Sequence, residues 1–181
     1  HDAAGGGRNI NADPLALELL RRHQRRAAPA EGIQHDVVLV AAGDIARCGW
    51  AVGGAIATAQ ALDHIPGTVI TLGDNAYPIG SAANFRDCYA PTWGRHKART
   101  HPSPGNHEYL TKDGAPYFDY FGAAAGADRN GYYSFDLGTW HVVSLNSNID
   151  AGADSPQVAW LRDDLKARPA TCTLAYWHEP V

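Results

Sequence analysis

The 181-residue chain contains no methionine, only three cysteines and no long apolar segment. A membrane-spanning helix needs about 18 or more apolar residues in a row, and the longest purely apolar run here is Val37 to Ala42. We therefore expect no membrane partner. Because the chain starts with His1 and lacks methionine, we expect a processed or cut N-terminus, with any signal peptide already absent.

The cysteines are Cys48, Cys88 and Cys172, too few and too scattered for a disulfide framework or a CxxC metal site. At most one bridge can form among them. The sequence does not say which pair, if any, is bonded, so it leaves the redox compartment open.

Basic residues are in the minority, with 15 Lys and Arg against 19 Asp and Glu and a net charge of -4. Nucleic-acid-binding domains are usually basic, so we expect no nucleic acid as a dedicated partner. A composition of 45% hydrophobic and 19% charged residues is typical of one globular domain at this length. The oligomeric state is not readable from these quantities.

The chain divides into a leader, residues 1–35, and a folded domain, residues 36–181. In the leader, Asp13 followed by Pro14 predicts the start of a short helix, whose four arginines are better explained as a solvated face than as a polyanion contact.

The domain alternates strand-like and helix-like segments, which predicts an α/β fold. The predicted strands are a buried one at 37–42, then 68–72, a hairpin of 132–137 with 140–146, and 172–177; the predicted helices are 53–64, part of 81–99, and 155–167 capped by Ser155.

Four strand-like segments each lead into a side chain that can bind metal. The chain reads Gly43-Asp44 after VVLVAA, Gly-Asp-Asn-Ala-Tyr at 73–77 after VITL, Gly-Asn-His-Glu at 105–108 after HPSP, and His178 after LAYW. One Gly-Asp is weak evidence, because both residues are common in turns. Four such strand ends in this order are hard to assign to turns alone. Carboxylate, imidazole and amide groups are ligands for hard to borderline dications.

These motifs resemble the calcineurin-like metallophosphoesterases, and within them the purple acid phosphatase-like branch. The resemblance covers the chain from Asp36 onward and implies a four-layer α/β/β/α sandwich with two metal ions, iron, zinc or manganese, at one end of the strands. It implies that Asp44 and Tyr77 bind the first ion, that Asp74 bridges both, and that Asn106 and His178 bind the second. His107 would be the catalytic proton donor.

Tyr77 is what separates this branch from the rest of the superfamily. Most calcineurin-like enzymes begin with Asp-x-His, whereas this chain has Ala46 at the histidine position. The branch that lacks this histidine has a tyrosine three residues after the bridging aspartate, where Tyr77 stands. A tyrosine merely packed on a loop before Pro78 is the competing interpretation. The branch usually has glycine where Ala46 stands, and nothing in the sequence says what this change does.

Other polar residues are weaker candidates. Glu108 either orients His107 or only begins a loop, and Glu179 is as easily plain surface. His141 is better explained as a satisfied core or sheet-face histidine than as a ligand. Four basic residues could help to hold a phosphate but are better explained as solvated: Arg86, Arg95, Lys97 and Arg99.

The family's last motif, Gly-His-x-His, has no counterpart, since no His-x-His occurs in the chain. We therefore expect an incomplete catalytic domain that is close to inactive alone. The predicted activity is that of an acid phosphatase-like phosphomonoesterase, a metal-dependent hydrolase of small-molecule phosphate esters with metal-bound hydroxide as nucleophile. The alternatives are a non-catalytic phosphate- or metal-binding module on the same scaffold, and a phosphodiesterase or nucleotidase. The resemblance also implies a secreted or cell-envelope protein.

Overall fold

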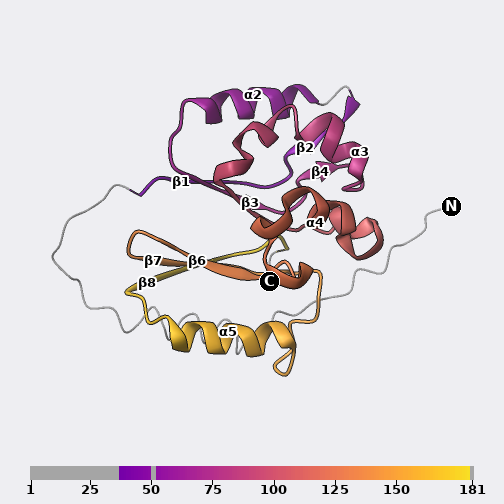
Figure 1. The fold of residues 1–181 in the computed structure, drawn as a ribbon. Helices are drawn as coiled ribbons and strands as arrows, with labels where there is room; N and C mark the ends of the chain where they lie inside the picture. Colours follow the sequence, from indigo (N-terminus) through magenta and orange to yellow (C-terminus); the bar gives the residue numbers. More distant parts are fainter. Residues whose placement is uncertain (1–36, 50–51, 180–181) are drawn as a thin grey trace.

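The computed structural model describes residues 37–49 and 52–179 (Figure 1). The helix predicted within the leader lies outside these residues. No helix within the described ranges has the length and apolar character that crossing a membrane requires.

The first sheet is parallel and has the order β1-β3-β5, formed by β1 (Leu39–Ala42), β3 (Thr68–Leu72) and β5 (Thr100–Ser103). Helix α2 (Val52–Asp63) connects β1 to β3 and lies over one face of this sheet (Figure 1). The prediction for β3 is confirmed residue for residue. The strand predicted at 37–42 is confirmed over Leu39–Ala42, but its predicted burial is wrong, because none of these residues is buried and Ala41 is exposed. The physical reason is that β1 lies at the edge of the described sheet.

The second sheet is mixed and has the order β6-β7-β8. The predicted hairpin is confirmed as antiparallel β6 (Tyr133–Leu137) and β7 (Trp140–Ser144), and β8 (Cys172–Tyr176) then pairs parallel to β7. The crossover to β8 is α5 (Pro156–Ala167), whose N-cap Ser155 accepts a hydrogen bond from the Val158 N–H as predicted.

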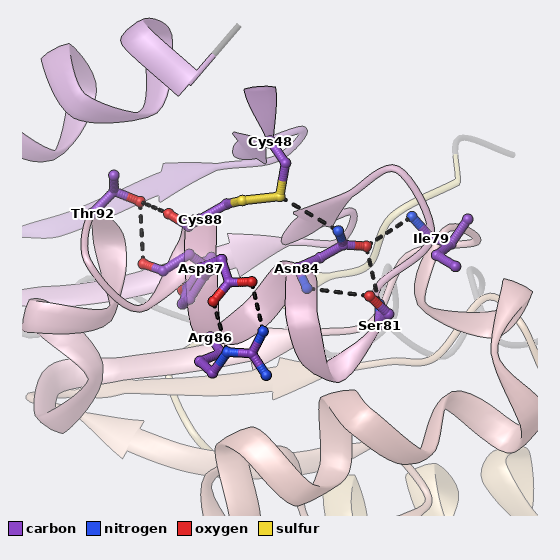
Figure 2. Close-up of a disulfide and its surroundings, with 9 residues drawn as sticks. Cys48, Ile79, Ser81, Asn84, Arg86, Asp87, Cys88 and Thr92 are labelled. Atoms are coloured by element: carbon purple, nitrogen blue, oxygen red, sulfur yellow. Dashed lines mark hydrogen bonds and ion pairs between the residues drawn. A yellow bond between two sulfur atoms is a disulfide. The ribbon is translucent and has the colours of Figure 1, made fainter. Parts of the chain in front are cut away.

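A smaller, irregular region lies beside the first sheet. It contains the two-residue parallel ribbon of β2 (Ala46–Arg47) and β4 (Ala76–Tyr77), helix α3 (Ala82–Asn84), a π-helical turn (Phe85–Tyr89), a 3₁₀ segment (Trp93–Arg99) and α4 (Ala115–Phe121). Short 3₁₀ turns occur at Glu108–Leu110, Lys112–Gly114, Gly122–Ala125 and Ala127–Arg129. A disulfide joins Cys48, just after β2, to Cys88 in the π-helical turn (Figure 2), and Cys172 is free.

The core residues alternate between the two faces of each sheet, as successive residues of a strand must. In β3, Val69 belongs to the cluster shared with α2, and Ile70 to the cluster between the sheets. In β7, Val142 faces the first sheet and Val143 packs with Leu161 of α5. The α/β class is therefore confirmed, with α2 and α5 on the outer faces of two facing sheets (Figure 1). Assignment to the metallophosphoesterase sandwich stays a prediction.

Candidate metal centre

The candidate residues meet where strands of the two sheets end. Asp44 follows β1, Asp74 follows β3 and Asn106 follows β5, and the carboxyl ends of parallel strands lie on the same side of a sheet. His178 follows β8 of the second sheet. Asp44 and Asp74 have positive φ angles of 55° and 50°. Aspartate tolerates this left-handed conformation better than most residues, and it turns the chain sharply after each strand.

Asp74 is the centre of the cluster. Its side chain is nearly fully buried and receives a hydrogen bond from the Tyr77 hydroxyl, at 2.6 Å from Oδ2, and one from the His107 N–H, at 3.0 Å from Oδ1. The Tyr77 hydroxyl also contacts Oδ1 of Asp44. His178 Nε2 lies 3.3 Å from Asp74 Oδ1. One carboxylate thus contacts Tyr77 of its own loop and groups from two other segments of the chain.

His178 joins the second sheet to this cluster. Its Nδ1 donates to the carbonyl oxygen of Leu72 at 2.7 Å, and its Nε2 lies 3.0 Å from Asn106 Oδ1. Gly73 makes this approach sterically feasible, because a Cβ there would lie 2.5 Å from the His178 side chain. A backbone carbonyl on one ring nitrogen leaves the other directed at the oxygen cluster, which is the usual arrangement of a metal-binding histidine.

Glu108 holds the backbone beneath the cluster and makes no recorded contact with the His107 ring. Its buried carboxylate accepts N–H groups of Asn75 at 2.9 Å, Ala76 at 3.2 Å and Gly105 at 2.8 Å. Two of these N–H groups lie within the loop from Asp74 to Tyr77, and the third belongs to the loop after β5. Glu108 begins a 3₁₀ turn, as one interpretation of the sequence had it, and it also holds the loop that follows Asp74, which neither interpretation foresaw.

His107 lies at the exposed side of the cluster. Its Nδ1 donates to the Pro78 carbonyl oxygen at 2.6 Å, and its Nε2 lies 3.8 Å from Asp74 Oδ2. The His107 and Tyr77 rings are tilted at 56°, with centroids 4.4 Å apart. The Pro78 carbonyl thereby directs Nε2 toward the cluster.

The pKa shifts reflect competition between burial and hydrogen bonding. Burial would raise the pKa of Asp74, but hydrogen bonds from His178, Tyr77 and the His107 N–H together keep it below its ordinary value. The hydrogen bond to Asp74 raises the pKa of His178 to about 9, against desolvation. Burial, followed by the hydrogen bonds to Asp44 and Asp74, raises the pKa of Tyr77. Burial raises the pKa of Glu108 to about 7, against its bonds from Gly105 and Ala76.

The side chains of the cluster can bind a metal ion only if phenol and amide oxygens act as ligands together with the carboxylates. Across 37–49 and 52–179, no group of three or more His, Cys, Asp or Glu side chains is arranged to hold a metal ion. The cluster instead combines two carboxylates with a phenol, an amide and an imidazole. Tyr77 links Asp44 to Asp74, and His178 links Asp74 to Asn106. These donors fit hard to borderline cations. The fit therefore depends on the oxygens of Tyr77 and Asn106.

The other weaker sequence candidates bond to other parts of the protein. His141 is buried, with its ring nitrogens 2.9 Å from Asp136 Oδ1 and 2.6 Å from Asp164 Oδ2, so its interpretation as a satisfied core histidine is confirmed. The N–H of Glu179 donates to the Ser147 hydroxyl. The four basic residues bond to other parts of the protein: Arg86 to Asp87, Arg95 to Asp63, Lys97 to the Tyr120 carbonyl, and Arg99 to the carbonyls of Leu62 and Gly67.

Sequence reasoning missed one basic residue beside the cluster. The guanidinium carbon of Arg47 lies 5.9 Å from the centroid of the Tyr77 ring. Its strand, β2, has only two residues, which is too short for any periodicity to be read from the sequence. No sequence signal could have placed Arg47 here.

Comparison with known proteins gives one partial similarity. No protein-family model matches the chain. The chain is similar to Purple acid phosphatase 23 from Arabidopsis thaliana, with 31% identity over 60% of this chain and 31% of the relative. The chain thus spans about a third of the length of this curated relative. A distant, partial relationship to a phosphatase is what the comparison supports.

Proposed function

We propose that residues 36–181 form part of the catalytic domain of a metal-dependent phosphoric ester hydrolase of the purple acid phosphatase-like kind, acting on small-molecule phosphomonoesters. The observation that carries this proposal is that contacts through Tyr77 and His178 link four strand-end side chains, with the buried Asp74 in the middle: Asp44, Asp74, Asn106 and His178. The partial similarity to a plant purple acid phosphatase supports the same reaction class. The order of helix, sheet, sheet and helix supports the four-layer sandwich.

In this proposal, the cluster holds two metal ions, iron, zinc or manganese. Asp44 and Tyr77 would bind one ion, Asn106 and His178 the other, and Asp74 both. Such ions supply Lewis-acid activation of water and neutralise charge on the phosphate. The Leu72 carbonyl keeps His178 Nε2 directed at the cluster. Glu108 keeps the Asp74–Tyr77 loop in place through three N–H groups.

His107 is the proposed proton donor to the leaving alkoxide. Its Nδ1 is held by the Pro78 carbonyl, so its Nε2 is the nitrogen that can transfer a proton beside the cluster. General acid catalysis of this kind contributes about 10²- to 10⁴-fold in rate. We therefore expect His107→Gln to lower kcat by that factor while leaving bound metal unchanged.

We also propose secretion or residence in the cell envelope. The Cys48–Cys88 disulfide supports this, because disulfides persist mainly in oxidising compartments.

The deciding experiment measures hydrolysis of an aryl phosphate by the protein as encoded, including any residues outside these 181. The protein is loaded with iron, zinc or manganese, and its metal content is determined. We expect metal-dependent turnover that a chelator abolishes. Phosphate or metal binding without turnover would favour the non-catalytic module instead. Preference for a diester or a nucleotide would favour the other enzymatic alternative.

A further inference from the structure

Arg47 lies directly beside the proposed metal ligands. Strand β2 pairs parallel to β4 with Arg47 opposite Tyr77, and the guanidinium lies over the Tyr77 ring. The hydroxyl of the same ring contacts Asp44 and Asp74. Arg47 is exposed, whereas its neighbour Ala46 is fully buried. A cationic side chain therefore extends into solvent at the edge of the cluster.

The backbone that carries Arg47 is fixed. Ala46 belongs to the main core cluster, and the following residue, Cys48, is bonded to Cys88. Figure 2 shows this disulfide with Asn84, whose side chain donates to Cys48 Sγ at 3.4 Å and also completes the cap of α3. The base of the Arg47 side chain is thus held in place, while the remainder of the side chain stays exposed.

No intramolecular acceptor occupies the Arg47 guanidinium within the part of the chain that the structure describes. The guanidinium makes no hydrogen bond or ion pair with these residues. By contrast, Arg86 and Arg95 each donate two hydrogen bonds to one aspartate. The cation–π contact with Tyr77 is weak at an exposed site and leaves the N–H edges of the guanidinium uncovered. Among residues 37–49 and 52–179, none of the five N–H donors of Arg47 has a hydrogen-bond acceptor, so they can bind an external ligand.

We propose that Arg47 binds the phosphate group of the substrate, an inference that rests on the proposed function. A guanidinium presents a planar fork of N–H donors that matches two oxygens of one phosphate. Arg47 lies where it can turn toward a phosphate at the hydroxyl end of the Tyr77 ring. It favours esters that present a dianionic terminal phosphate, because two negative charges attract the guanidinium more strongly than the single charge of a diester.

The test compares Arg47→Gln and Arg47→Lys with Arg86→Gln in the metal-loaded protein as encoded. Arg86 is a matched control, because it is an exposed arginine on the π-helical turn, paired with Asp87. Binding of inorganic phosphate is measured by calorimetry. KM and kcat are measured with an aryl phosphate, and metal content is measured by elemental analysis. Loss of a charge-assisted hydrogen bond of about 1.5–3 kcal/mol corresponds to roughly 10- to 100-fold in affinity.

We expect Arg47→Gln to weaken phosphate binding and raise KM for the monoester by this factor, with metal content unchanged. Arg47→Lys should recover part of the loss, and Arg86→Gln should match the wild type. Equal phosphate affinity in Arg47→Gln and Arg86→Gln would overturn the proposal, as would loss of metal in Arg47→Gln, which would show a role through Tyr77 instead. If the wild type binds phosphate but hydrolyses no ester, the proposed function fails and the binding data still decide the role of Arg47.

Discussion

Asp74 has both a structural and a chemical part in the cluster. It is nearly fully buried, yet an unpaired buried carboxylate is costly. Hydrogen bonds from the Tyr77 hydroxyl and the His107 N–H, with His178 nearby, offset that cost. The same oxygens are those that the proposed metals would share. Replacing this residue is therefore the most direct test of the ligand set.

We expect Asp74→Asn to lower turnover of an aryl phosphate by the protein as encoded by more than about 100-fold, because even partners of metal ligands are worth 10- to 100-fold. Bound metal, measured by elemental analysis, should fall with it. The control is Asp87→Asn, an exposed aspartate that pairs with Arg86. Retention of both metals at a near-normal rate would contradict the bridging assignment.

A second residue-scale prediction concerns Glu108. In Glu108→Gln, an NH₂ group replaces one of the two oxygens that now accept N–H groups, so a donor faces a donor. We expect a loss of roughly 2–3 kcal/mol in the free energy of unfolding, measured by denaturant titration. Asp119→Asn, which removes one charge of an exposed ion pair with Arg129, should cost less than about 1 kcal/mol. Similar small losses in both variants would show that Glu108 does not hold the loop.

At the scale of elements, the turn after β5 requires a glycine, which has no side chain. A Cβ at Gly105 would overlap Oδ1 and the backbone N of Asp74. The loop after β5 can therefore approach the loop after β3 only because residue 105 is glycine. In helix α2, by contrast, Gly54 has room for a side chain, because a Cβ there would have no atom within 4 Å.

We expect Gly105→Ala to destabilise the protein by about 1–3 kcal/mol through overpacking and to reduce metal binding by displacing Asp74. Gly54→Ala should instead stabilise it by about 0.5–1 kcal/mol, because alanine loses less entropy in a helix. Thermal and denaturant unfolding of the two variants measure this opposite sign. A neutral Gly105→Ala would mean that the two loops are free to move apart.

At the scale of the whole molecule, the disulfide connects the ribbon that carries Arg47 to the helical region beside it. It closes a loop with a sequence separation of 40 residues, for which chain entropy predicts about 4 kcal/mol of stabilisation. We expect reduction to lower the unfolding free energy by roughly this amount, measured by denaturant titration with and without a reductant. Cys172→Ser serves as the control, because Cys172 is free. An unchanged unfolding curve on reduction would argue against the bridge.

The interface between the two sheets predicts a dependence of stability on pH. His101 of β5 stacks on Phe135 of β6 with ring centroids 3.7 Å apart, and burial lowers its pKa. The unfolded state therefore binds a proton at His101 more readily than the folded state does. The unfolding free energy is highest with respect to this group above about pH 6.5, and it falls as the pH decreases below that value. One such group changes it by at most about 1.4 kcal/mol per pH unit.

Denaturant titrations between pH 5 and 7.5 should show a shallower decrease in His101→Gln than in the wild type. The comparison isolates His101 from His178, whose raised pKa acts in the opposite sense: its stabilisation is present below about pH 6.5 and is lost as the pH rises toward 9. Parallel pH profiles in the two proteins would exclude His101 as the source.

The sequence by itself determined several of the strands and helices and the polar residues that stand at strand ends. Residues 68–72, the hairpin about Gly138 and the helix capped by Ser155 follow from local patterns of apolar, turn and capping residues, which act over a few positions. Gly-Asp and Gly-Asn-His-Glu after strands could be read in the same way.

Only the tertiary structure decided which distant residues touch. It placed β1 at a sheet edge, paired Cys48 with Cys88, gave Glu108 the N–H groups of the Asp74 loop and brought Arg47 over Tyr77. These contacts join residues about 30 to 40 positions apart. The physical reason is that strand and helix patterns depend on residues a few positions apart in the sequence. The pairings listed above depend instead on how two sheets and an irregular helical region pack together.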